Sequence, residues 1–212
     1  MTGRMTSVNL RVEGQVGRIT LDRPETLNAL TLAMIEAIDR QLRVWADSPD
    51  VAMVMIDGAG RRSFCAGGDV QWVYARMQSG ELSDASRFFR AEYRLNQLIA
   101  TYPKPYVALM HGIVIGGGVG LSAHGSHRIV TDETLLALPE CSIGLIPDVG
   151  TSWLLGRAPG RLGEYIGLTG LRLSGTDAIA AGFADYYIAS GQLADLTAKI
   201  VAAAHPGSST AC

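Results

Sequence analysis

The stretch that decides the fold reads His-Gly-Ile-Val-Ile-Gly-Gly-Gly-Val-Gly-Leu-Ser over residues 111–122. It follows the apolar run 106–110, and together they predict a buried strand that ends in a glycine cluster and turns into a helix over about 117–124. Backbone N–H groups at such a helix start have no partner inside the helix, so they suit an anion or a developing oxyanion. Taken alone, the same glycines could serve only the close packing of a helix on a sheet.

A second glycine-rich turn, Ala66-Gly67-Gly68-Asp69, also follows an apolar strand and precedes a helix. Two such turns on adjacent strands could direct two N–H groups at one oxygen, which is the geometry of an oxyanion hole for a thioester or ester carbonyl. Neither turn is a phosphate-binding P-loop, because no Gly-Lys-Ser/Thr follows. The pair Gly116-x-Gly118 lacks the third glycine and the acidic residue of a dinucleotide site.

The rest of the chain predicts one α/β domain. Alternating residues predict a hairpin over 8–12 and 16–21, and apolar runs predict strands over 51–56, 106–110, 128–131 and 135–138, with a last one over 186–188. Helical spacing predicts helices over 32–46, 85–101, 117–124, 150–157, 161–168 and 175–182, with Thr31 and Ser174 as N-caps. Pairs of strands followed by a helix argue for ββα units rather than the strict alternation of an eightfold barrel.

Composition and charge exclude several classes of protein. The 212 residues are 48% apolar and 18% charged, with a net charge of −2 and no basic stripe, so a buried core is expected and nucleic acid is not an expected partner. Cys65, Cys141 and Cys212 form no Cys-x-x-Cys pair, which disfavours a disulfide framework or zinc site and favours a reducing compartment. No run of about 18 apolar residues occurs, so we expect a cytoplasmic protein with no membrane partner.

Four motifs resemble, in the right order, those of the crotonase (enoyl-CoA hydratase/isomerase) superfamily: Leu21-Asp-Arg-Pro-Glu-Thr-Leu-Asn-Ala-Leu30, Ser63-Phe-Cys-Ala-Gly-Gly-Asp69, Gly112-x-x-x-Gly-Gly-Gly118, and Pro139-Glu140 with Gly144-Leu-Ile-Pro147. The resemblance implies a crotonase-like spiral of ββα repeats with surrounding helices. It implies an acyl-coenzyme A substrate, no further cofactor and no metal. Residues 1–190 would form the acyl-CoA-binding domain and 191–212 a short tail, with the family's C-terminal helical region largely absent.

The resemblance also implies where the substrate lies. The thioester oxygen would sit between the backbone N–H groups of Gly68 and Gly117. Further substrate-binding residues would be Leu27, Asn28, Ala66, Gly67, Asp69, Val70 and Gly116, of which the Asn28 and 66–70 segments would follow the coenzyme A moiety.

The acidic residues point to one branch of the family. Hydratases typically carry one glutamate after the Gly-Gly-Gly-x unit and one at the Pro-Glu site; here these positions are Gly120 and Glu140, which disfavours water addition by two carboxylates. The run 140–150 resembles 3-hydroxyisobutyryl-CoA hydrolases of valine catabolism, which implies that Glu140 and Asp148 are catalytic and that Glu92 contacts the substrate. Glu140 would attack the carbonyl or activate a water, and both routes stay open.

Other interpretations stay open at this point. Glu140 alone could serve an enoyl-CoA hydratase or isomerase of fatty-acid metabolism, and a truncated crotonase-fold protein could bind acyl-CoA without catalysis. Without the resemblance, Glu92 would be a solvated helix residue and Asp148 only an N-cap. Family members continue past the end of this chain, so apolar surface on its last helices predicts a homo-oligomer.

The histidines show no spacing typical of metal ligands. His111, His124 and His127 are scattered along the chain, and we expect structural polar roles for them.

Overall fold

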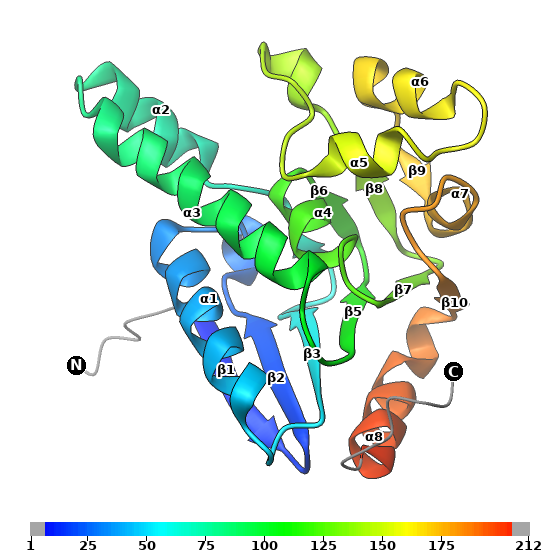
Figure 1. Ribbon diagram of the computed structural model, residues 1–212. Helices are drawn as coiled ribbons and strands as arrows, with labels where there is room; N and C mark the ends of the chain where they lie inside the picture. Colours follow the sequence, from blue (N-terminus) through cyan, green and yellow to red (C-terminus); the bar gives the residue numbers. More distant parts are fainter. Residues whose placement is uncertain (1–6, 205–212) are drawn as a thin grey trace.

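The computed structural model describes residues 7–204, so the polar tail and Cys212 lie outside the described residues. Strands form two sheets, and helices pack on them (Figure 1). The larger sheet has the order β1 (Val8–Glu13), β2 (Val16–Leu21), β3 (Met53–Gly58), β5 (Tyr106–Met110), β7 (His127–Thr131) and β10 (Tyr186–Ile188). The smaller sheet has the order β4 (Ser63–Cys65), β6 (Ile113–Ile115), β8 (Leu135–Ala137) and β9 (Leu173–Ser174).

The pairing confirms the predicted ββα repeat. In the pairs β3–β4, β5–β6 and β7–β8, the first strand joins the larger sheet and the second joins the smaller one. Within both sheets only β1–β2 and β8–β9 pair antiparallel, and the remaining pairs are parallel. Strands β4, β6 and β9 were not predicted as separate strands, because two or three residues are too short to show a periodic pattern.

The helices begin largely where their capping residues predict. Helix α1 (Leu32–Asp47) starts after Thr31, whose side chain accepts from the Met34 N–H at 3.2 Å. Helix α7 (Gly175–Ala180) starts after Ser174, which forms a capping box with Asp177. The others are α2 (Val70–Gln78), α3 (Leu82–Ala100), α4 (Gly117–Ser122), α5 (Thr151–Leu155), α6 (Leu162–Thr169) and α8 (Leu193–Ala203), with 3₁₀ turns η1 (Pro24–Thr26), η2 (Glu140–Ile143) and η3 (Ser190–Gln192). Helix α3 begins three residues earlier than the predicted 85–101.

The larger sheet is covered on both faces. On one face α1 packs against β1 and against α3, and its buried side includes Ile35, Ile38 and Leu42. On the other face α8 covers a second, smaller apolar cluster formed by Val16, Met55, Val107, Leu109 and Ile129. Burial on both faces explains the nearly continuous apolar sequence of β5.

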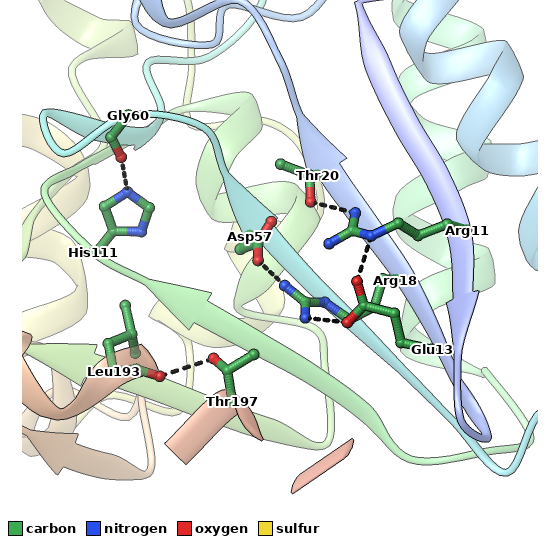
Figure 2. Close-up of polar contacts among 9 residues, drawn as sticks. All are labelled: Arg11, Glu13, Arg18, Thr20, Asp57, Gly60, His111, Leu193 and Thr197. Atoms are coloured by element: carbon green, nitrogen blue, oxygen red, sulfur yellow. Dashed lines mark hydrogen bonds and ion pairs between the residues drawn. The ribbon is translucent and has the colours of Figure 1, made fainter. Parts of the chain in front are cut away.

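A charged network lies on the α8 face of the same sheet (Figure 2). The guanidinium of Arg18 on β2 is 6% exposed and donates to Glu13 on β1 at 2.9 Å and to Asp57 on β3. Arg11 donates to Glu13 at 2.6 Å and to Thr20 at 2.9 Å. A buried charge of this kind is tolerated because its partners neutralise it.

Within residues 7–204, no helix has the length and apolar character that crossing a membrane requires.

Candidate active site

Both glycine turns border one cavity of about 160 Å³. The 66–70 turn connects β4 to α2, and the 116–118 turn connects β6 to α4, so the neighbouring strands β4 and β6 bring the turns together. The expected site residues that line the cavity are Ala66, Gly67, Gly68, Val70, Glu92, Gly116, Gly117, Glu140 and Asp148.

The backbones of Gly68 and Gly117 lie close together at the cavity. A Cβ added to Gly117 would lie 3.2 Å from the Gly68 nitrogen. Gly117 is the first residue of α4, so its N–H has no acceptor within the helix, and no acceptor for the Gly68 N–H occurs among residues 7–204. Gly67, which precedes Gly68, has φ +101°, a conformation that favours glycine. Two unpaired backbone donors at one cavity can stabilise an oxyanion.

Three carboxyl groups from three different segments of the chain line the same cavity as these donors. Glu92 comes from the middle of α3, and its Oε1 occupies the space where a Gly117 side chain would begin. Glu140 is the first residue of η2, and its Oε1 lies 3.0 Å from the Cβ position of Gly116. Asp148 precedes α5 and lines the same cavity. The structure therefore brings together the three acids that the sequence singled out.

Burial shifts the proton affinity of all three acids in the same direction. Glu92 is 3% exposed, and burial, aided by the charges of Asp148 and Glu140, raises its pKa to about 8. Burial raises the pKa of Glu140 to about 7, with Asp148 adding to the shift. Burial also raises the pKa of Asp148, against the hydrogen bond that it accepts. Near neutral pH, Glu92 is mainly a neutral hydrogen-bond donor, whereas Glu140 is partly ionised and can act as a base or nucleophile.

Tyr93 is a site residue that the sequence reasoning missed. Its hydroxyl donates to Asp148 Oδ2 at 2.7 Å. Burial and the Asp148 carboxylate both raise the pKa of this hydroxyl, so it keeps its proton and donates. The only available signal was its place next to Glu92, but adjacent helical residues point to different faces, so the pattern did not link Tyr93 to the site.

Three expected binding residues do not line the cavity. The Asn28 side chain is fully buried: it accepts from the Arg23 N–H at 3.0 Å and donates to the carbonyls of Ala59 and Ser63. The amide group of Asn28 therefore makes its hydrogen bonds to other parts of the protein.

Leu27 and Asp69 support the neighbouring turns. The Leu27 carbonyl accepts from the Ala66 N–H at 3.0 Å. Asp69 caps α2 by accepting from the Trp72 N–H at 3.2 Å, and it borders an adjacent cavity of about 360 Å³.

Gly120 has no room for a side chain. A Cβ added there would lie 2.7 Å from the Val149 Cβ and 2.8 Å from the Asn96 Nδ2. Real Cβ atoms do not approach this closely, so a carboxylate at this position would require both neighbours to move. The cavity is therefore lined by Glu92, Glu140 and Asp148, and no acidic side chain lies at the start of α4.

Within residues 7–204, three histidines make structural polar contacts, and Cys65 is buried. His111 Nε2 donates to the Gly60 carbonyl at 3.0 Å, and His124 Nε2 donates to the Val149 carbonyl at 2.7 Å. His127 Nδ1 lies 2.9 Å from the Ser126 hydroxyl. Across the described part of the chain, no group of three or more His, Cys, Asp or Glu side chains could hold a metal ion.

Known proteins resemble this chain closely. A 3-hydroxyisobutyryl-CoA hydrolase of Xenopus tropicalis is 49% identical over 89% of this chain and 49% of its own length. The Homo sapiens protein of the same name is 46% identical over 97% of this chain and 53% of its own length, so the chain spans about half the length of these curated relatives. A solved enoyl-CoA hydratase from Rhodobacter sphaeroides is 49% identical with a TM-score of 0.91, covering 93% of this chain and 58% of that one.

A more distant solved structure confirms that the fold is crotonase-like. An enoyl-CoA hydratase from Bacillus anthracis is 25% identical with a TM-score of 0.83, covering 93% of this chain and 76% of that one. The model of the family described as enoyl-CoA hydratase/isomerase matches residues 16–211. With two sheets of paired strands and two glycine turns at one cavity, the chain belongs to the enoyl-CoA hydratase/isomerase family.

Proposed function

We propose that this chain hydrolyses an acyl-coenzyme A thioester of the 3-hydroxyisobutyryl type, as in valine breakdown. The observation that carries the proposal is the set of groups around one cavity. The unpaired N–H groups of Gly68 and Gly117 border it, and so does the partly ionised Glu140. Gly120, in contrast, has no space for the side chain of a second acid. The name shared by the vertebrate relatives supports the choice of acyl group.

The geometry supports the following sequence of steps. The thioester oxygen accepts from the N–H groups of Gly68 and Gly117, and loss of one such donor would raise the barrier by roughly 3–4 kcal/mol. Glu140 attacks the carbonyl carbon, or takes a proton from a water that attacks it. The carbon–sulfur bond then breaks and coenzyme A leaves as a thiolate. Water supplies the oxygen of the free acid in both routes.

The other two acids would serve binding and orientation. Glu92, neutral near pH 7 because burial raises its pKa to about 8, can donate a hydrogen bond to the substrate hydroxyl. Asp148, held by Tyr93, would orient the attacking group or return a proton. The coenzyme A moiety would pass along residues 66–70 toward the cavity beside Asp69, with no other cofactor and no metal.

An enoyl-CoA hydratase or isomerase is the second candidate. The strong similarity to the solved enoyl-CoA hydratase from Rhodobacter sphaeroides favours it. The closed space at Gly120 disfavours it, because water addition by two carboxylates would need an acid at the start of α4.

One panel assay separates the candidates. The chain is given 3-hydroxyisobutyryl-CoA, acetyl-CoA and crotonyl-CoA, and both free-thiol release and loss of enoyl absorbance are recorded. We expect thiol release with 3-hydroxyisobutyryl-CoA and stable enoyl absorbance with crotonyl-CoA. Enoyl loss without thiol release would favour the hydratase, and neither signal would favour a non-catalytic acyl-CoA-binding protein.

We also propose that the protein self-associates and works in a reducing compartment such as the cytoplasm. Large exposed apolar side chains on and near α5 and α6 support self-association: Ile146, Trp153, Tyr165 and Leu168. Unpaired Cys65 and Cys141 support a reducing compartment, although the vertebrate relatives are named mitochondrial. Light scattering of the purified chain and cell fractionation test these two proposals; a stable monomer would contradict the first.

A further inference from the structure

The turn that carries Asp148 has an unfavourable backbone conformation. Val149 has φ +47° although its side chain is β-branched, and it is 1% exposed. A β-branched residue rarely adopts this left-handed region, and such strain persists where the surroundings hold it in place. Gly150 follows with φ +75°, so the chain reverses directly after Asp148.

His124, two residues beyond the end of α4, holds the strained residue. Its Nε2 lies 2.7 Å from the Val149 carbonyl oxygen. Because a carbonyl oxygen only accepts, Nε2 carries the proton and donates it. A Cβ added to Gly150 would lie 2.9 Å from the same Nε2, so the ring lies directly against the backbone of the turn. Burial lowers the pKa of His124, which disfavours its charged form.

The remaining contacts of the turn divide into local and distant ones. Thr151 donates from its N–H at 2.8 Å and from its hydroxyl at 2.7 Å to the Asp148 carbonyl, which is a contact within the turn itself. Tyr93 on α3 holds the Asp148 side chain. Within residues 7–204, the bond from His124 is the one hydrogen bond that ties the strained Val149 backbone to a segment outside the turn, the one that follows α4. Without it, Val149 can relax to negative φ and rotate the Asp148 carboxyl.

We propose that His124 is a positioning residue for the hydrolysis. By holding the Val149 carbonyl, His124 keeps the left-handed turn and sets the Asp148 carboxyl against the Tyr93 hydroxyl. His124 does not line the cavity that contains Glu140, so it acts through Asp148 rather than on the substrate. The inference rests on the proposed function, because it takes Asp148 to serve hydrolysis.

Two substitutions at His124 distinguish the contribution of its N–H donor from that of its ring. His124→Phe keeps a planar ring and removes the donor, whereas His124→Gln keeps an N–H donor of similar reach. We expect His124→Phe to lower kcat for 3-hydroxyisobutyryl-CoA by up to about 100-fold, the effect of a displacement of about 1 Å, with KM unchanged. His124→Gln should recover most of kcat. An unchanged kcat in His124→Phe, or equal losses in both variants, would overturn the proposal.

A double-mutant cycle with Asp148→Asn tests whether His124 affects kcat through Asp148. If His124 acts through Asp148, His124→Phe should cause no further loss of kcat in the Asp148→Asn background. Losses that multiply would indicate a general structural role and overturn the proposal. Full activity of Asp148→Asn alone would instead refute the role of Asp148 in the proposed function.

One readout is independent of activity. The distance between the amide and α protons of Val149, measured by their intraresidue NOE in the labelled full chain, is shorter at positive φ than at negative φ and therefore reports the left-handed conformation. We expect His124→Phe to weaken this NOE and His124→Gln to keep it. An unchanged NOE in His124→Phe would show that His124 does not hold the turn, whatever reaction the protein catalyses.

Discussion

Glu92→Gln is expected to stabilise the protein at alkaline pH and to leave its stability nearly unchanged at pH 5. The substitution keeps the size and shape of the side chain and removes its charge. In the native protein, Glu92 is 3% exposed, and burial beside Asp148 and Glu140 raises its pKa to about 8 from an ordinary value of 4.5. Its Oε1 has no hydrogen-bond partner among the described residues, so nothing there compensates the carboxylate for losing water.

The sign and the size of this change in the free energy of unfolding follow from the difference between the pKa values of Glu92 in the folded and unfolded protein. Between pH 4.5 and 8, the unfolded chain loses the Glu92 proton while the folded protein keeps it, so the free energy of unfolding falls as pH rises. The loss is about 1.4 kcal/mol per pH unit and is complete above the folded pKa. The glutamine variant escapes this loss, which corresponds to a gain of about 5 kcal/mol at pH 9 and less than about 1 kcal/mol at pH 5.

Urea unfolding of both proteins at pH 5, 7 and 9 measures the gain directly. The matched control is Glu164→Gln on α6, because Glu164 is exposed and the Arg161 guanidinium lowers its pKa. The control should show no alkaline gain. If the free energy of unfolding of Glu92→Gln followed the same pH dependence as that of the unchanged protein, Glu92 would ionise normally, and its assignment as a neutral donor would be wrong.

Three further predictions concern the chemistry. Gly117→Ala should lower kcat by about 10²–10³-fold, because a Cβ there displaces Glu92 and blocks the oxyanion position. The control is Gly191→Ala, which should leave thiol release unchanged because the space around Gly191 is open. Tyr93→Phe should lower kcat about tenfold by releasing Asp148, and an unchanged rate would show that this hydrogen bond does not matter. The kcat–pH profile should fall as pH drops through about 7, where Glu140 takes up its proton; a profile flat from pH 5 to 8 would contradict its role as base or nucleophile.

Local patterns in the sequence predicted most of the elements and the two glycine turns, whereas the donor positions Gly68 and Gly117 came from the resemblance to the family. Thr31 and Ser174 cap helices as expected, because capping depends on neighbouring residues in the chain. The two glycine turns were recognisable because each follows an apolar strand. Their meeting at one cavity follows from β4 and β6 lying side by side in the smaller sheet.

Contacts between distant segments were not visible in the sequence. The burial of Glu92 depends on the glycine turns packed over α3, and the bond from Tyr93 to Asp148 joins residues 55 positions apart. The left-handed conformation of Val149 has no sequence signal, because it falls on a β-branched residue rather than a glycine. The three hydrogen bonds that the Asn28 side chain makes to backbone groups were also not visible in the sequence, and the expected contact of the Asn28 segment with coenzyme A stays a prediction.

The most direct test of the proposed hydrolysis is the rate of thiol release from 3-hydroxyisobutyryl-CoA by the unchanged chain and by Glu140→Gln. Glutamine keeps the size of the side chain but cannot act as a nucleophile or base at neutral pH. We predict rapid release by the unchanged chain and a loss of at least about 10²-fold in the variant, with KM little altered. Equal rates of thiol release in the two proteins would contradict the assignment of Glu140 to thioester hydrolysis.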